Sequence, residues 1–274
     1  MKNVMNNDEK ARNALYVIKI GGNIIDDELK LATFLKNFAA IREKKILVHG
    51  GGKLADRIAE KLGVPQQMIE GRRITNAETL KIITMVYGGY INKNIVAQLQ
   101  STGCNAIGLS GADANSILAH KRIHSSVDYG FAGDVESSRF NIKGWQIFLE
   151  NDLIPVACPI THDGKGQLLN TNADTIAQEI AKGLSASYAV NLIYTFEKSG
   201  VLLNVNDDNS VIKKMNAESY RKLKDKQQIY AGMIPKVDNA FSALAAGVKK
   251  VMIGNAEKLN ELVAGTSGTS IVNE

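Results

Sequence analysis

The chain has 274 residues, 45% hydrophobic and 22% charged, so it can bury a sizeable core in one large domain or two small ones. Its net charge of +5 suits anionic small molecules, but it is too small to indicate nucleic-acid binding. No stretch of eighteen apolar residues and no apolar leader is present, which predicts a cytoplasmic protein without a membrane span. Cys104 and Cys158 lack metal-site spacing, so we expect two buried free thiols.

Short apolar runs alternate with helical patterns along the first part of the chain, which is typical of a mainly parallel sheet. The predicted strands are 14–20, 45–48, 106–109 and 154–160. The predicted helices are 27–43, 53–63 and 77–100, the last with a break at Gly88-Gly89. Residues 112–145 show no clear period, so we expect irregular structure with short β pieces there.

The second part of the chain continues the alternation. His162 to Gln167 form a predicted turn between short strands, and Asn172 is a predicted N-cap of a helix that ends at Gly183. A strand at 188–194, a polar segment to 226, a helix at 236–246 and a strand at 248–253 follow. We therefore predict an α/β fold with an open, mainly parallel sheet sandwiched by helices, and a boundary near residue 187.

Two predicted strands end in glycine clusters, Lys19-Ile20-Gly21-Gly22 and His49-Gly50-Gly51-Gly52. Glycine lets the backbone approach a ligand closely, and the helix N-terminus beyond it favours an anion. Neither cluster matches GxxxxGK[ST] or a complete GxGxxG, because Ala55 occupies the last glycine position. Each glycine cluster taken singly could be a tight turn without function. Two glycine clusters at the carboxyl ends of strands together favour a ligand site.

Three charged residues at the ends of predicted strands and helices are candidates for the site. Lys19 interrupts an apolar strand beside the first glycine cluster, although it could also extend to solvent. Asp174 lies in the first turn of a helix, where an acid also simply complements the helix dipole. Lys236 lies near a helix N-terminus, which is unfavourable unless an anion binds there.

Six segments together resemble the acetylglutamate kinases of the amino-acid-kinase superfamily. They are KIGG (19–22), HGGG (49–52), GRRIT (71–75), DYGFAGDV (128–135), NTNAD (170–174) and GMIPKV (232–237), in the family's order and over nearly the whole chain. NTNAD together with GMIPKV is specific, whereas carbamate, aspartate and uridylate kinases share the glycine motifs. The resemblance implies a three-layer αβα fold of the amino-acid-kinase type.

The resemblance also implies a role for each matched residue. Lys19 and Lys236 would stabilise the transition state, and Asp174 would organise them. Gly21 and Gly22, with the two lysines, would bind the phosphates of ATP. Gly50, Gly51 and Asn170 would contact the acylglutamate, and Arg73 would hold its α-carboxylate. Residues 1–187 would form the acylglutamate-binding lobe and residues 188–274 the ATP-binding lobe, with Mg²⁺ on the phosphates and no protein ligand to it.

The implied reaction is ATP-dependent phosphorylation of the γ-carboxylate of N-acetyl-L-glutamate, the second step of arginine biosynthesis. Another N-acylglutamate, such as N-succinylglutamate, stays open because nothing in residues 112–145 identifies the acyl pocket. A glutamate carboxyl has a pKa of about 4.3, so the acceptor is already an anion and needs no general base. The difficulty is repulsion between two anions, and two lysines with Mg²⁺ would relieve it.

One departure and several alternatives remain. Where the family has an aspartate near the nucleotide, this chain has Glu197, so the adenine pocket is not specified. Another kinase of the superfamily, or an amino-acid sensor without catalysis, fits most of the motifs; a dehydrogenase lacks its GxGxxG turn.

The oligomeric state follows from the same resemblance. Arginine-inhibited members carry an extra N-terminal helix that joins dimers into hexamers, whereas here about thirteen mostly polar residues precede the first strand. We therefore expect a two-fold homodimer without arginine feedback. Leu80, Ile83, Val86 and Tyr87 form a stripe on helix 77–100 that could be either the contact surface or ordinary core.

Overall fold

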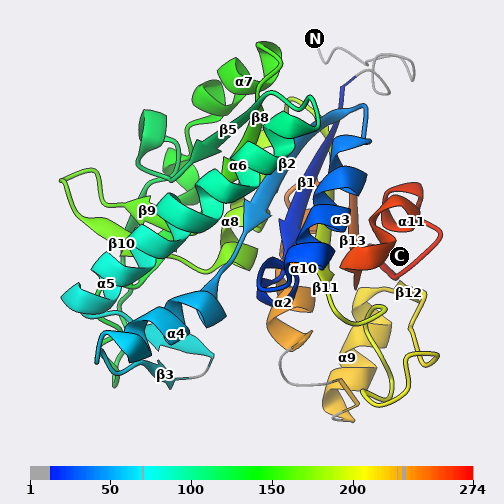
Figure 1. Cartoon of the computed structure of the whole chain (residues 1–274). Coiled ribbons are helices and arrows are strands. Elements are labelled where there is room, and N and C mark those ends of the chain that lie inside the picture. Colours follow the sequence, from blue (N-terminus) through cyan, green and yellow to red (C-terminus); the bar gives the residue numbers. More distant parts are fainter. Residues whose placement is uncertain (1–12, 70, 227, 230–232, 274) are drawn as a thin grey trace.

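A computed structural model describes residues 13–69, 71–226, 228–229 and 233–273 (Figure 1). Its centre is an eight-stranded sheet in the order β12-β14-β13-β11-β1-β2-β8-β5. The strands are β1 (Ala14–Ile20), β2 (Lys44–His49), β5 (Ala106–Leu109), β8 (Ile154–Ala157), β11 (Ala189–Phe196), β12 (Lys214–Met215), β13 (Lys250–Asn255) and β14 (Thr269–Ile271). Neighbouring strands are parallel except β13 and β14, so the prediction of an open, mainly parallel sheet is confirmed.

Three short antiparallel hairpins lie outside this sheet. They are β3 (Gln67–Ile69) with β4 (Arg72–Ile74), β6 (Ala119–Lys121) with β7 (Gly133–Val135), and β9 (Ile160–His162) with β10 (Leu168–Asn170). The prediction of one strand over 154–160 is wrong, because β8 ends at Ala157 and β9 begins at Ile160. Pro159 lies between them, and a proline cannot donate to the hydrogen-bond ladder of a central strand.

Helices cover both faces of the sheet (Figure 1). They are α2 (Gly22–Ile25), α3 (Glu28–Ala39), α4 (Gly52–Lys61), α5 (Ala77–Thr84), α6 (Asn92–Ser101), α7 (Ile142–Glu150), α8 (Ala173–Leu184), α9 (Ala217–Asp225), α10 (Ile234–Ala245) and α11 (Leu259–Ala264). None of the helices in the described parts of the chain is long and apolar enough to cross a membrane.

The side chains of β1 show why the molecule has three layers. Leu15 and Val17 pack into one apolar cluster with residues of α7, α8 and α10. Ile18 and Ile20 pack into a second cluster, with residues of α3, the 77–101 helix and α11. A strand buried on both faces has to be apolar almost throughout, and in β1 (ALYVIKI) the one charged residue is Lys19. The predicted helix–sheet–helix arrangement is therefore confirmed.

The long helix after β4 is continuous, and the predicted break at Gly88-Gly89 is wrong. The α-helical segments α5 and α6 are joined by a π-helical segment, Met85–Ile91, that contains both glycines. A π-helical stretch takes up an extra residue without interrupting the helix, which is how the glycine pair is accommodated here.

The apolar stripe on this helix belongs to the core of the protomer. Leu80, Ile83, Val86 and Tyr87 are all buried in the second cluster. The ordinary-core interpretation of the stripe is therefore the one observed. The exposed apolar side chains on the same helix are Met85 and Tyr90, each about 60% accessible.

Four of the helices were not predicted from the sequence: α2, α7, α9 and α11. α7 lies at the end of the segment expected to be irregular and buries Trp145 and Leu149. α9 lies in the polar segment before residue 226, where Asn216 and Ser219 form a capping box. Residues 1–12, on which the expectation about arginine feedback depends, and Gly232 of the GMIPKV motif lie outside the described residues.

Candidate functional site

Both glycine turns stand at the carboxyl ends of adjacent central strands, β1 and β2, as predicted. Gly21 precedes α2 and Gly51 precedes α4. A Cβ atom added at Gly22 or Gly50 would meet no protein atom within 4 Å, so these backbones border open space. Gly51 has φ of +150° and packs on the long helix, where a Cβ would come 2.3 Å from Ile91 Cδ1. Glycine is therefore needed there for conformation as well as space.

Lys19, Asp174 and Lys236 meet at this end of the sheet. Lys19 Nζ lies 2.8 Å from Asp174 Oδ1, and Lys236 Nζ donates to Asp174 Oδ2 at 2.5 Å. The three residues come from the end of β1, the first turn of α8 and the first turn of α10. The structure thus brings together three residues that the sequence places far apart.

Local structure fixes the orientation of the trio. The Asn172 side chain caps α8, accepting from the backbone N–H groups of Asp174 and Thr175, which confirms the predicted N-cap. Pro235 stands in the first turn of α10, where its missing N–H costs nothing. Thr195 Oγ1 donates to the carbonyl oxygen of Lys19 at 2.9 Å and ties the ends of β11 and β1 together.

The two lysines keep the Asp174 carboxylate ionised. Burial raises the pKa of the Asp174 carboxyl, but the positive charges of Lys19 and Lys236, with the hydrogen bond from Lys236, outweigh burial and hold that pKa well below its ordinary value. The carboxylate is therefore ionised at neutral pH, and the trio carries a formal charge of +1. Oδ1 has no well-aligned hydrogen bond, so Lys19 contacts it as an ion pair. Such a group can attract an anion and still keep two ammoniums close together.

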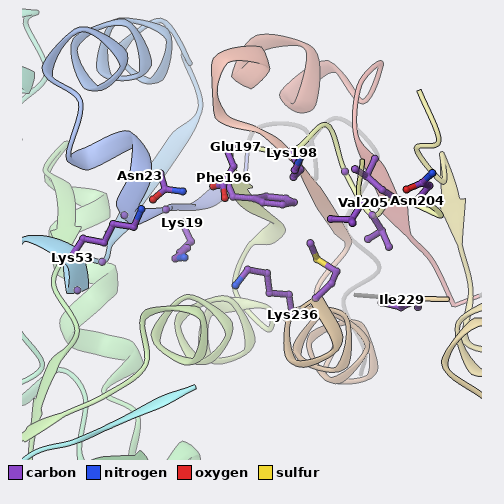
Figure 2. Close-up of a pocket in the computed structure, with 18 of the residues that line it drawn as sticks. Lys19, Asn23, Lys53, Phe196, Glu197, Lys198, Asn204, Val205, Ile229 and Lys236 are labelled. Carbon is purple, nitrogen blue, oxygen red and sulfur yellow. The ribbon is translucent and has the colours of Figure 1, made fainter. Parts of the chain in front are cut away.

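A cavity of about 880 Å³ opens above the trio, bordered by Lys19, Lys236 and both glycine turns. Figure 2 shows Asn23 and Lys53 on the side of the glycine turns, and Asn204, Val205 and Ile229 on the opposite side. The side away from the turns is largely apolar, with Val201, Leu202, Leu203, Val205, Ile229 and Met233 in its lining, and Phe196 lies beside the Gly21 turn. An apolar wall beside a cationic, glycine-lined floor suits a flat base attached to a chain of phosphates.

A smaller cavity of about 190 Å³ adjoins the large one and shares Gly50, Gly51 and Gly52 with it. Its lining also includes Arg72, Arg73, Arg122, Asn170 and residues 171–173, which directly precede Asp174. The expected substrate residues Gly50, Gly51, Arg73 and Asn170 therefore do converge on one cavity. The volume of this cavity suits one small molecule, and its arginines suit anionic groups on that molecule.

Arg73 is buried and already held by protein partners. Its Nη1 donates to Asp56 Oδ1 and Gln66 Oε1, and its Nη2 donates to the Gly52 carbonyl oxygen at 3.4 Å. A guanidinium has five N–H donors, so some remain for a ligand. Asn170 Nδ2 donates to Thr75 Oγ1 at 3.0 Å, which fixes the plane of its amide.

His49, within the second glycine motif, is fully buried and does not face either cavity. Its Nδ1 lies 2.8 Å from the Gly50 carbonyl oxygen, and its Nε2 lies 3.1 Å from Asn92 Nδ2. Since an amide nitrogen can only donate, Nε2 must accept and the imidazole must be neutral. Burial, with a smaller effect of the Lys93 charge, lowers the pKa of His49 to about 4.

The sequence interpretation missed four basic residues of the two cavities: Lys53, Arg72, Arg122 and Lys198, which lies beside Glu197 in the large one. Lys53 follows HGGG at the start of α4, so the reasoning applied to Lys236 would also have found it. Arg72 stands beside Arg73 in GRRIT, where only the second arginine was considered. Arg122 lies in the segment without periodicity, and no sequence signal marks it.

The two cysteines line neither cavity. Cys104 and Cys158 are free and buried, as predicted, and burial raises the pKa of the Cys158 thiol to about 12. Within the described residues no three His, Cys, Asp or Glu side chains cluster as metal ligands. Glu197 lines the large cavity near Phe196.

Comparison with known proteins agrees with this geometry. Residues 14–255 match the model of the amino acid kinase family. A protein of Cytophaga hutchinsonii named acetylglutamate kinase is 54% identical over 261 residues, which cover 94% of this chain and 98% of that one. A protein of the same name from Phocaeicola vulgatus is 52% identical over 247 residues, covering 90% and 95%. The crystal structure of smu.665 from Streptococcus mutans superposes with a TM-score of 0.78 at 28% identity, covering 96% and 100%.

Proposed function

Because the chain belongs to the amino acid kinase family, we propose that it transfers the γ-phosphoryl group of ATP to the γ-carboxylate of an N-acylglutamate. N-acetylglutamate is the first substrate to test, since close relatives are named acetylglutamate kinase. The observation that carries the proposal is the Lys19–Asp174–Lys236 trio at the junction of a large and a small cavity.

We assign ATP to the large cavity and the acylglutamate to the small one. The apolar wall, which includes Val201, Leu202, Leu203, Val205, Ile229 and Met233, would take the adenine, in agreement with an ATP-binding lobe at 188–274. Gly21, Gly22, Lys19 and Lys236 would contact the phosphates. The small cavity is lined by residues of the proposed acylglutamate lobe, 1–187. Glu197 is placed to contact the nucleotide in the position where the family has an aspartate.

The chemistry follows from charge. The acceptor carboxylate is an anion and attacks without a base, while the two ammoniums offset the negative charge shared by acceptor and phosphoryl group. Asp174 contacts both lysines, so it holds the two ammonium groups side by side and pointed at one place. Mg²⁺ would be held mainly by the phosphate oxygens and water, neutralising charge on the transferring group.

Arg73 would hold the α-carboxylate of the substrate from the buried end of the small cavity. Its planar fork can accept a carboxylate on two N–H groups while Asp56 and Gln66 keep the group in place. Gly50, Gly51 and Asn170 would offer backbone and amide contacts to the rest of the glutamate. A cytoplasmic homodimer acting at the second step of arginine biosynthesis remains part of the proposal.

The test is product formation from ATP and N-acetylglutamate with Mg²⁺, trapping the acyl phosphate with hydroxylamine. Wild-type protein should form the hydroxamate, and Lys19→Ala or Lys236→Ala should lower kcat roughly 10²- to 10³-fold. The exposed Lys249 provides a matched control, since Lys249→Ala should leave turnover unchanged. Turnover of carbamate or aspartate in place of acylglutamates would reject the substrate assignment, and near-normal turnover by Lys236→Ala would reject the site.

A further inference from the structure

Arg122 lies on the wall of the small cavity, in the β6–β7 hairpin. It directly follows β6, and its backbone N–H donates to the Ala132 carbonyl oxygen at 2.8 Å. Ala132 in turn pairs with Asn170, one of the residues assigned to substrate. The hydrogen bonding of the backbone therefore places Arg122 beside the acylglutamate site.

The guanidinium of Arg122 is well supported by the protein. Its Nη2 donates to Asp134 Oδ1 in an ion pair, and its Cζ lies 5.7 Å from the ring centroid of the buried Tyr129. The side chain is only 19% exposed. An arginine fixed by a carboxylate on one side and an aromatic ring on the other is preorganised for planar recognition.

The Nε–H of Arg122 is buried and has no hydrogen-bond partner among the described residues. A buried donor of a charged group that lacks a partner is costly, and most such groups in folded proteins are satisfied. Because this donor belongs to a side chain that lines the cavity, an acceptor on the ligand would satisfy it. A carboxylate is the acceptor that best matches a guanidinium.

The charges of the proposed substrate do not account for this arginine. N-acetylglutamate has two carboxylates: the γ-carboxylate faces the lysines, and the α-carboxylate is assigned to Arg73. Its acetyl group offers one neutral carbonyl oxygen beside the amide and then ends in a methyl, which has no charge to pair with Arg122. An N-acyl group that ends in a carboxylate would supply the missing acceptor.

We propose, on the basis of the function proposed above, that the natural substrate is a glutamate with a dicarboxylic N-acyl group, of which succinyl is the four-carbon example. Arg122 is the residue that recognises the terminal carboxylate of that group. Arg72, on the opposite hairpin, adds positive charge to the same cavity. The acyl group is therefore selected by charge, and the reacting γ-carboxylate keeps the same place for every acylglutamate.

The experiment compares kcat/KM for N-succinylglutamate, N-acetylglutamate and N-butyrylglutamate, the last matching the succinyl chain in length without its charge. Wild-type protein should prefer the succinyl substrate to the butyryl one by tenfold or more. Arg122→Gln should lower kcat/KM for N-succinylglutamate about 10- to 100-fold through KM, as expected for loss of a charged hydrogen bond. The same variant should change the other two substrates little. Arg42→Gln, an exposed arginine on the loop that precedes β2, should change none of them.

Each outcome separates the two proposals. If no acylglutamate is phosphorylated, the proposed function fails and this inference with it. If all three are phosphorylated equally well, or if Arg122→Gln leaves their ratio unchanged, the inference is overturned and the function stands. Should Arg122→Gln not fold, wild-type protein titrated with N-succinyl- and N-butyrylglutamate by calorimetry decides, because equal affinities would contradict a carboxylate site.

Discussion

His49 should make the stability of the protein depend on pH in a window where few other groups titrate. The buried imidazole is neutral in the folded state, with a pKa of about 4, whereas the ordinary value is 6.5. Between these two values the unfolded chain binds a proton that the folded protein does not bind. Stability is therefore unaffected above about pH 7 and falls as the pH drops, until the folded state also protonates near pH 4.

The magnitude follows from the two pKa values. One unit of pKa difference corresponds to 1.36 kcal/mol, so the free energy of unfolding should fall by about 2 kcal/mol between pH 7 and pH 5. Typical domains unfold at a cost of 5–15 kcal/mol, so a loss of this size is easily measured. Carboxylates such as Asp174, with its lowered pKa, contribute at more acidic pH.

Urea unfolding at fixed temperature, without ligands, should be measured from pH 7 to pH 5 for wild type and for His49→Gln. The variant has no imidazole at this position, so the difference between the two proteins isolates His49 from other groups. The NMR signals of the wild-type His49 ring give a second measurement that does not require the variant to fold. A difference that stays constant over this range, or a ring that titrates near pH 6.5, would refute the reasoning.

Four further results are expected. Asp174→Asn should lower kcat roughly 10²- to 10³-fold and leave the fold intact, measured by hydroxamate formation and circular dichroism; near-normal turnover would contradict the role of the carboxylate. Arg73→Lys should raise KM for the acylglutamate far more than KM for ATP, and equal changes would argue against the clamp. Gly51→Ala should destabilise the protein by about 1–3 kcal/mol because of its φ and its contact with the long helix, whereas Gly50→Ala should spare stability and impair substrate binding. Light scattering at micromolar protein should give a dimer whose mass and activity do not change with millimolar arginine; a hexamer or inhibition would contradict this.

The alternation of apolar strands and helices was enough to predict the sheet, because a strand buried on both faces leaves a plain apolar run, as in β1. Helices without such a signal were missed. α9 has a polar surface and a single buried side chain, Tyr220, so charged residues hide its apolar periodicity. The π-helical segment was also missed, since two adjacent glycines more often end a helix than pass through one.

The candidate site was predictable in part. Lys19 and Lys236 each break a local rule, which is why they could be selected from the sequence. Asp174 breaks none, because an acid is normal in the first turn of a helix, so only the resemblance to a family distinguished it. Arg122 could not be found at all: its position follows from the pairing of Ala132 with Asn170, a contact between distant segments that no local pattern encodes.

The position of β1 in the sheet has a consequence for how the protein is made. Among the described strands β1 is synthesised before the others, yet it lies in the middle of the sheet, with Ala14 paired to Ala189 on one side and Leu15 to Lys44 on the other. Until β11 has emerged from the ribosome, one edge of β1 stays unpaired. The sequence of β1 is apolar enough for that edge to associate with other chains. A nascent chain shorter than about 200 residues should therefore depend on chaperones. Cutting the gene near residue 187 should likewise yield two fragments that aggregate when expressed separately and recover activity only when expressed together.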